Sequence, residues 1–328
     1  MRSIFPLFVF FCILKLNVSC QETFTLIPLG SAGGYYDHEL TAYILLDNAA
    51  GTGVLLDGGS LFPGLEAAAE KGNIPCKNTG ESIHAFYTQH IPAVLISHPH
   101  MDHIAGFAVF SADDTKKWIL GSNFTLEALR THIFNWVIWP DMTDQGDGLC
   151  LGKYHLQPLP FDSVFPIPET NMNVEAFPLS HGNGGYSSTA FLISKGTEYF
   201  LYLGDTGADR LEGCNFLDAI WQRCGPLIKN GALKAIVIEC SYPKVQPENM
   251  LFGHLNSTLL LEELEKLAGY TDAENLTTAL QEVTLLINHI KPVKGNYQSI
   301  KKIIENEINQ TRLSLRVRFP EQGKAYSF

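Results

Sequence analysis

Three histidines and one aspartate stand within six consecutive residues, directly after an apolar segment. The segment Ala93-Val94-Leu95-Ile96 predicts a short buried strand, and the residues from His103 to Phe110 predict a helix. Between them lies the motif His98-Pro99-His100-Met101-Asp102-His103. Neutral imidazole and carboxylate are ligands of zinc and its first-row neighbours, so the motif predicts a metal site. The chain must therefore end a strand and begin a helix around metal ligands, unless this is only a histidine-rich surface loop.

Further ligands must come from elsewhere, because four side chains cannot fill the coordination shells of two metal ions. His181, Asp205 and His289 each follow a strand-like segment of the later sequence. A single histidine or aspartate at a strand end is usually an ordinary hydrogen-bonded loop residue. Three of them in order after the histidine-rich motif favour a binuclear metal site, which we expect to hold two divalent ions, zinc first, with manganese or iron as alternatives.

The spacing H-x-H-x-D-H after an apolar strand resembles the signature of the metallo-β-lactamase superfamily. The longer stretch from His98 to Ala112 is similar to the signature of the class II cyclic-nucleotide phosphodiesterases. It differs at Met101, Phe107 and Ala108, where apolar residues replace other apolar residues. The similarity covers roughly residues 24 to 320. Its other matching segments are Ser188–Ile193, Leu203–Thr206, Ile238–Pro243, Gly253–Leu255 and Asn288–Pro292.

The resemblance implies an α/β fold, an αββα sandwich of two mixed sheets flanked by helices. It implies one metallo-hydrolase domain over residues 21–328 that hydrolyses cAMP or cGMP to the 5′-monophosphate by attack of a metal-bridged hydroxide. A lactonase, arylsulfatase or β-lactamase could use the same metals, and a non-catalytic, metal-stabilised surface binding protein is a further alternative. The sequence does not separate cAMP from cGMP, and it does not indicate an oligomeric state.

As a hypothesis, each metal-site residue receives a role. One ion would be held by His98, His100 and His181. The other would be held by Asp102, His103 and His289. Asp205 would bridge the two ions, and Asp102 is also counted with the catalytic residues.

Two residues outside the metal set are candidates for catalysis. His254 would give a proton to the departing 3′ oxygen, and Glu239 would orient it, a pairing that resembles the Glu–His couple of related tRNA-processing enzymes. The alternatives are a helix-entry residue for His254 and a structural acid for Glu239. Asp57 would support the metal loop through hydrogen bonds. The amides of Gly33 and Gly34 would approach a phosphate, although a plain turn is the alternative.

Alternating strand-like and helix-like segments agree with this fold. The predicted strands are Phe24–Leu29, Tyr43–Leu46, Val54–Leu56, Ala93–Ile96, Val174–Phe177, Ala190–Ile193, Tyr199–Leu203, Ala235–Ile238, Val283–Ile287 and Leu313–Phe319. The predicted helices are Leu61–Glu70, His103–Phe110, Thr125–Trp136 and Ser257–Leu267. The stretch from Trp136 to Phe165 is predicted to be a long loop or lid.

The N-terminus predicts export. Met1-Arg2 is positively charged and the segment from Ile4 to Leu14 is almost wholly apolar, so residues 1–20 read as a signal peptide. Cys20 makes a lipoprotein signal one alternative and an ordinary cleaved signal the other. Either places the mature chain in the periplasm or at the cell surface, with lipid on Cys20 as the only membrane anchor.

The charge balance excludes one class of partner. The chain has 23 Lys and Arg against 34 Asp and Glu, a formal net charge of −11. Binding to DNA or long RNA depends on clustered Lys and Arg, so we expect no nucleic-acid partner. A small anion such as a cyclic nucleotide can still bind where metal ions dominate the local field.

Overall fold

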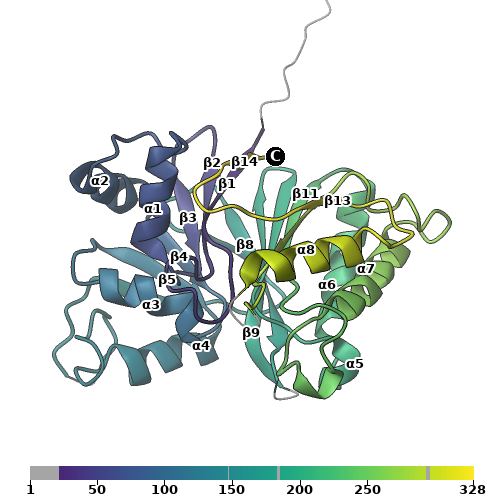
Figure 1. The fold of residues 1–328 in the computed structure, drawn as a ribbon. Helices are drawn as coiled ribbons and strands as arrows, with labels where there is room; N and C mark the ends of the chain where they lie inside the picture. The colour runs from purple at the N-terminus through teal and green to yellow at the C-terminus, as the bar shows by residue number, and fades with distance from the viewer. Residues whose placement is uncertain (1–21, 147, 183–184, 293–295) are drawn as a thin grey trace, which may run out of the picture.

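The computed structural model describes residues 22–328 except 147, 183–184 and 293–295. The predicted signal segment, residues 1–20, and the candidate lipidation site at Cys20 lie outside the described residues. The described chain forms two seven-stranded sheets that pack face to face; the first is built from the first half of the sequence and the C-terminal strand β14, Tyr326–Ser327, and the second from the second half. Figure 1 shows the first half in purple and blue and the second in green and yellow, with helices on the outer sides.

The first sheet has the strand order β14-β1-β2-β3-β4-β5-β6. Strands β1, β2 and β3 form an antiparallel meander, whereas β3, β4, β5 and β6 run parallel to one another. The bounds are β1 Phe24–Gly30, β2 Ala42–Asp47, β3 Gly53–Leu56, β4 Ala93–Ile96, β5 Lys117–Gly121, β6 Tyr154–Pro158 and β14 Tyr326–Ser327. Parallel strands need crossover connections, and here helices supply several of them.

The second sheet has the order β13-β12-β11-β10-β9-β8-β7. Strand β9 is antiparallel to both β8 and β10, and β10, β11, β12 and β13 are parallel. The bounds are β7 Val164–Pro166, β8 Asn173–Ser180, β9 Tyr186–Lys195, β10 Glu198–Leu203, β11 Leu233–Glu239, β12 Thr284–Asn288 and β13 Arg316–Arg318. Both sheets are therefore mixed, as the resemblance implied.

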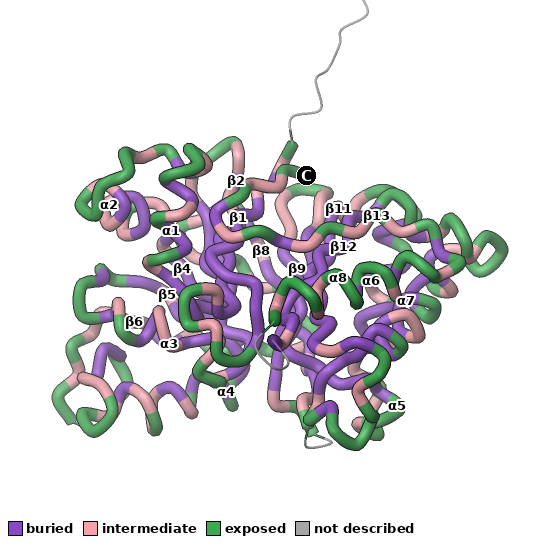
Figure 2. Tube along the Cα trace, in the orientation of Figure 1, coloured by how far each residue is buried: buried purple, intermediate pink, exposed green. Residues whose placement is uncertain are grey.

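Side chains that alternate along each strand build three apolar layers. In β4, Leu95 packs between the sheets, while Val94 and Ile96 face the helices of the first half. In β10, Tyr202 packs between the sheets and Leu203 faces the helices of the second half. Figure 2 shows the buried residues along the sheets and the exposed ones on the outer helices and loops. This layering confirms the predicted sandwich.

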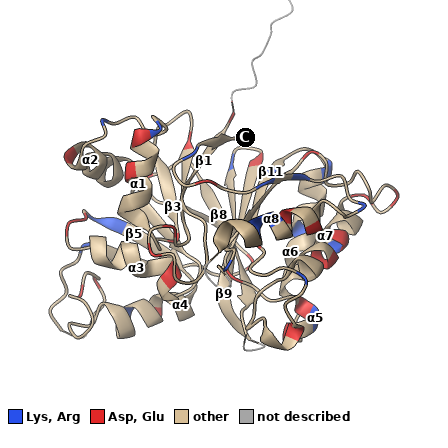
Figure 3. Ribbon diagram, viewed as in Figure 1, with Lys and Arg blue, Asp and Glu red and all other residues tan. Residues whose placement is uncertain are grey.

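Helices cover the outer faces of the sheets. Beside the first sheet lie α1 Leu61–Glu70, α2 Gly80–His90, α3 Met101–Phe110 and α4 Asn123–Ala128, which continues as a π-helical turn, Leu129–Ile133. With the second sheet lie α5 Asp209–Glu212, α6 Phe216–Lys229, a 3₁₀ turn Glu248–Met250, α7 Ser257–Thr271 and α8 Tyr297–Ile308. The charged residues that are coloured in Figure 3 lie mostly on these outer helices and loops. No helix within the described residues is long and apolar enough to cross a bilayer.

The structure corrects several predicted elements. The stretch from Trp136 to Phe165 is not one long loop, because β6 lies inside it and β7 begins at Val164. Strand β5 was missed because it opens with Lys117, whose buried ammonium pairs with Asp114 at 3.4 Å. Helix α6 was missed because Gly225 and Pro226 interrupt its pattern. Helices α2 and α8 were also missed, and the helix predicted over Thr125–Trp136 starts and ends earlier.

Candidate metal centre

Strand direction explains why residues far apart in sequence meet at one edge of the second sheet. Strands β8, β10, β11 and β12 point the same way, so their carboxyl ends lie together. His181 follows β8, Asp205 follows β10, Glu239 ends β11 and His289 follows β12. These four side chains therefore gather beside one another, at the edge where the first sheet presents its histidine-rich loop.

The first sheet contributes that loop at the end of β4. His98 follows the strand after one residue, Ser97, and His100 is the residue before the first turn of α3. Asp102 and His103 then lie in the first turn of α3, so the strand end and the helix start present four side chains to one point. This is the arrangement that the sequence predicted for the motif.

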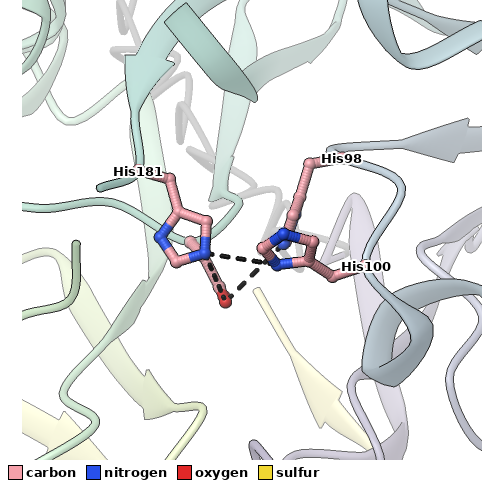
Figure 4. A group of neighbouring side chains, drawn as sticks. His98, His100 and His181 are labelled. Atoms are coloured by element: carbon pink, nitrogen blue, oxygen red, sulfur yellow. Dashed lines mark hydrogen bonds and ion pairs between the residues drawn. The ribbon is translucent and has the colours of Figure 1, made fainter. Parts of the chain in front are cut away.

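The first group of candidate ligands contains Asp205 and three histidines on one side of it. His98, His100, His181 and Asp205 offer ligand atoms within 4.8 Å of one another. His181 Nε2 lies 3.3 Å from His100 Nδ1, and His98 Nε2 lies 3.7 Å from Asp205 Oδ2. Figure 4 shows the three rings turned toward one carboxylate oxygen. The geometry suits one divalent ion with three imidazoles and a carboxylate.

A second group lies on the other side of Asp205. Asp102, His103 and His289 also offer atoms within 4.8 Å of one another. His289 Nε2 lies 3.3 Å from Asp102 Oδ2 and 3.1 Å from Asp205 Oδ2. His103 Nε2 lies 3.2 Å from Asp205 Oδ1. Asp205 therefore sits between the two groups, as a bridging ligand would. The structure brings all seven predicted side chains together, and their assignment as ligands remains a prediction.

Hydrogen bonds to the ring nitrogens leave the opposite nitrogens free. His98 Nδ1 donates to Ser97 Oγ at 3.0 Å and His103 Nδ1 donates to Asp57 Oδ2 at 2.8 Å. His181 Nδ1 donates to the carbonyl of Gly253 at 2.8 Å. Each donation places the lone pair on Nε2, the form in which histidine ligates a metal.

An observation independent of the motif supports a cation at this point. The Nε2 atoms of His98 and His103 are buried, yet they have no hydrogen-bond partner among the described residues. A buried nitrogen without a partner costs free energy unless something accepts its lone pair. These two orphaned nitrogens, beside the carboxylate of Asp205, therefore fit a metal ion.

Asp57 supports the ligand loop from the end of β3. Its carboxylate accepts the Ser97 amide at 2.7 Å and the Ser97 hydroxyl at 2.7 Å, besides His103 Nδ1. Tyr202, from the second sheet, donates its hydroxyl to the same carboxylate at 2.6 Å. The backbone φ of Asp57 is +53°, an uncommon value outside glycine that is held here by the surrounding bonds. Asp57 thus occupies the supporting position that the sequence predicted, and Tyr202 joins the two sheets through it.

Glu239 and His254 form a buried pair next to the second group. His254 Nδ1 donates to Glu239 Oε1 at 2.9 Å. Ser241 donates its hydroxyl to Glu239 Oε2 at 2.7 Å and accepts from His289 Nδ1 at 3.0 Å. On the other side of the ring, Lys291 Nζ lies 2.8 Å from His254 Nε2. The predicted Glu239–His254 contact exists, and Ser241 and Lys291 add contacts that the sequence did not predict.

The glycine loop after β1 packs against the candidate metal ligands. The amide of Gly33 donates to the Ile290 carbonyl at 3.2 Å, and that of Gly34 donates to Asp102 Oδ2 at 3.0 Å. A Cβ on Gly33 would lie 2.5 Å from the ring of His289, so only glycine permits this approach. Both amides have protein acceptors in this structure, and their approach to a phosphate stays a prediction.

The charges of the site suit a cation. Burial, together with the neighbouring His103, holds the pKa of His98 well below its usual range. Burial also lowers the pKa of His100 to about 4. Burial alone would raise the pKa of Asp205, but His289 and His103 hold it well below its usual range. Neutral His98 and His100 beside an ionised Asp205 are in the states that metal ligation requires. Burial would lower the pKa of His103, but the carboxylates of Asp205 and Asp57 raise it well above its usual range, so this ring would release a proton on binding a metal.

Glu212 is a supporting residue that sequence reasoning missed. Its carboxylate accepts the Ser180 hydroxyl at 2.8 Å and the Gly182 amide at 3.1 Å, on either side of His181. No motif marked Glu212, because it lies in the short helix α5, far from His181 in sequence. Ser241 and Lys291 carried a weak signal, since each lies two residues from a predicted site residue.

Comparison with solved structures defines the class of this fold. The metallo-β-lactamase fold protein YhfI from Bacillus subtilis is 16% identical, with a TM-score of 0.60 over 94% of this chain and all of that one. Human tRNase Z, short form, is 15% identical, with a TM-score of 0.53 over 92% of this chain and 98% of that one. Unliganded yeast PDE1 is 23% identical, with a TM-score of 0.80 over 94% of this chain and 99% of that one. The protein therefore has a metallo-β-lactamase-like fold.

Sequence comparison narrows the class to one family. The family model of class-II cAMP phosphodiesterases matches residues 69–323, so the chain belongs to that family. A probable 3′,5′-cyclic-nucleotide phosphodiesterase of Yersinia pestis is 35% identical over 93% of this chain and 89% of its own length. The 3′,5′-cyclic-nucleotide phosphodiesterase of Aliivibrio fischeri is 34% identical over 98% of both chains. The family predicted from the segment His98–Ala112 is confirmed.

Proposed function

We propose that this class-II phosphodiesterase hydrolyses 3′,5′-cyclic nucleotides to 5′-monophosphates at a centre of two divalent metal ions. The observation that carries the proposal is the convergence of six side chains on Asp205, with two buried imidazole nitrogens left without hydrogen-bond partners among the described residues. The names of the relatives in Yersinia pestis and Aliivibrio fischeri support cyclic nucleotides as the substrate. No other class of phosphate ester is needed to account for the site.

The two groups around Asp205 define which residues would hold each ion. His98, His100 and His181 would hold one. Asp102, His103 and His289 would hold the other, and Asp205 would contact both. When bound, two such ions supply hydroxide near neutral pH and offset charge on the phosphoryl oxygens. Five imidazoles and two carboxylates favour zinc over magnesium or calcium, and manganese or iron remain the alternatives that elemental analysis separates.

The side chains of this protein do the remaining tasks. Hydrolysis adds oxygen to phosphorus and breaks the bond to the 3′ oxygen, which leaves as a poor leaving group and needs a proton. We assign His254 to the side of this departing oxygen, where Glu239 holds its Nδ1 nitrogen. Burial, which outweighs the opposing charge of Glu239, lowers the pKa of His254. Asp102, held by the Gly34 amide, contacts His289 and keeps the second group together.

The N-terminal sequence supports a proposed location. Residues 1–20 carry an early positive charge and an apolar segment, followed by Cys20, so we propose export to the periplasm or cell surface. Lipid on Cys20 would be the membrane anchor. Changing Cys20 to serine should then release a membrane-bound protein into the soluble fraction, or block its processing, without loss of activity. Equal partitioning of both proteins into the soluble fraction would indicate a simple exported enzyme.

One assay tests the proposed reaction against its alternatives. Purified protein is incubated with 3′,5′-cAMP and 3′,5′-cGMP, with and without a chelator, and the 5′-monophosphates are measured. Metal-dependent release of the 5′-monophosphate supports the proposal. Hydrolysis of a lactone, an aryl sulfate or a β-lactam without turnover of either cyclic nucleotide would indicate another enzyme of the same fold. Metal content without any turnover would indicate a binding protein.

A further inference from the structure

Lys291 places a positive charge beside the catalytic pair. It lies two residues after His289, and its Nζ atom is 2.8 Å from Nε2 of His254. His254 is 3% exposed, whereas Lys291 is partly exposed. The ammonium therefore lies on the more open side of the buried imidazole.

The direction of this hydrogen bond follows from the chemistry of the two groups. An ammonium group can only donate, so Nε2 of His254 must accept with its lone pair. The ring proton is then on Nδ1, where it is donated to Glu239 at 2.9 Å. Glu239, His254 and Lys291 form a chain of two hydrogen bonds in which the proton facing away from Glu239 belongs to Lys291.

The backbone around Lys291 is held in place on three sides. Its amide donates to the carbonyl of Ser241 at 3.0 Å. The carbonyl of Ile290 accepts from Gly33, and that of Pro292 accepts the Tyr35 hydroxyl at 2.9 Å. These bonds fix the backbone from which the Lys291 side chain extends, and the contact with His254 Nε2 holds its ammonium, as transition-state stabilisation requires.

The charge of Lys291 is not neutralised by a carboxylate. Within the described part of the chain it forms no ion pair, and its hydrogen bond goes to the neutral ring of His254. The nearby carboxylate of Glu239 already accepts from His254, Ser241 and the amide of Thr206. An unpaired cation in a site for an anionic phosphodiester is available to the substrate.

We propose that Lys291 is a catalytic residue of the phosphodiester hydrolysis proposed above, on which this inference rests. Its ammonium donates a hydrogen bond to the departing 3′ oxygen of the bound cyclic nucleotide and offsets the negative charge that develops there. His254 and Glu239 position the ammonium, and His254 acts on the departing oxygen through it. The role needs only the fixed positive charge of the lysine side chain, and the departing 3′ oxygen takes its proton from water once its bond to phosphorus has broken.

The experiment compares two substrates and three variants. Lys291→Met should lower kcat for cAMP by about 10²-fold, the typical loss for one donor to a developing oxyanion. The loss should be much smaller for bis(4-nitrophenyl) phosphate, because nitrophenolate is stable without a donor. Lys291→Arg keeps the charge and should recover part of the rate. Lys229→Met is the matched control, since exposed Lys229 ends α6 just before β11 begins, away from Glu239 at the other end of that strand, and it should behave like the wild type.

Metal content and a double variant complete the test. Lys291→Met should keep the metal content of the wild type, and combining it with His254→Ala should cost little more than the larger single change, because the two act as a unit. Equal losses on both substrates, an unchanged kcat for cAMP, or a rate loss explained by missing metal would each overturn the inference. If the wild type itself fails to turn over cAMP, the proposed function is wrong; if only Lys291→Met behaves like the wild type, Lys291 alone is excluded.

Discussion

The two sheets supply the candidate metal ligands in different ways. The first sheet contributes His98, His100, Asp102 and His103 from one loop and one helical turn at the end of β4. The second contributes His181, Asp205 and His289 from the ends of three different strands. The first set is local in sequence, whereas the second exists only because three strands run in the same direction. A motif can therefore reveal one half of such a site and only suggest the other.

The support for the ligands differs in the same way. A single carboxylate, Asp57, accepts hydrogen bonds from Ser97 and His103 and so orients the whole loop of the first sheet. In the second sheet the two histidines have separate supports: the Gly253 carbonyl for His181 and the Ser241 hydroxyl for His289. Removing one supporting residue should therefore disturb more candidate ligands in the first half than in the second.

The largest effect is expected at Asp205, where the two contributions meet. Asp205→Ala removes the carboxylate that lies between both groups, so turnover should be abolished and metal content should fall below two ions per chain. Elemental analysis and cAMP hydrolysis check this. The control Asp113→Ala removes an exposed carboxylate and should change neither quantity. Full activity with a single tightly held ion in the wild type would contradict the binuclear centre.

His254 tests whether the second sheet also carries groups that act on the substrate. His254→Ala should lower kcat for cAMP by about 10²–10⁴-fold, because the ammonium of Lys291 that stabilises the departing oxygen loses the ring that positions it. Metal content should stay near that of the wild type. A nitrophenyl phosphodiester, whose leaving group needs no proton, should be affected much less. If that substrate slows just as much, His254 has a binding or structural role instead.

The supports themselves sharpen the comparison. Asp57→Asn should weaken metal affinity by about 10–100-fold, since it disturbs the orientation of both Ser97 and His103. Ser241→Ala should have a smaller effect, because it removes the partner of only one ligand, His289. Tyr202→Phe removes one hydrogen-bond donor to Asp57, so its metal affinity should lie between those of the wild type and Asp57→Asn. Chelator competition measures all three, and equal losses for Asp57→Asn and Ser241→Ala would remove the distinction between the halves.

The smallest effect is expected at the opposite edge of the sheets. There Asp47, at the end of β2, pairs with Lys195, at the end of β9, across the two sheets. Burial would raise the pKa of Asp47, but the bond from Lys195 and the amides of Ala49 and Ala50 lower it. The pair should stabilise the fold by at most about 1 kcal/mol, above the unfolded pKa of about 3.9, and this gain is lost as the pH falls through the lower folded pKa. Urea unfolding of wild type and Asp47→Asn should differ at pH 7 and converge at low pH; a constant gap would contradict the assignment.

The parts of the fold that could be predicted are those with a strong local pattern. Apolar segments such as Ala93–Ile96 and Ala235–Ile238 predict buried strands, because an apolar run of four residues has the length of a strand and is shorter than a usual helix. Strand β5 was not predicted, because it opens with a charged residue, Lys117. The structure shows that Asp114 and the carbonyls of Tyr87 and Ile91 bind its ammonium. Helix α6 was not predicted, because Gly225 and Pro226 have poor helix propensity. The helix forms because its apolar side chains pack against the second sheet.

The sequence by itself indicated a metal site, because His98, His100, Asp102 and His103 offer metal-ligating side chains within six residues. It also determined the family, through motifs that lie along most of the chain. Only the tertiary structure decided which side chains form hydrogen bonds to the site residues and which bring charge to the site. Tyr202 reaches Asp57 across the two sheets, and Lys291 reaches His254 from a neighbouring strand end. Such contacts have no spacing in the sequence, because they depend on how the sheets pack and on the common direction of their strands.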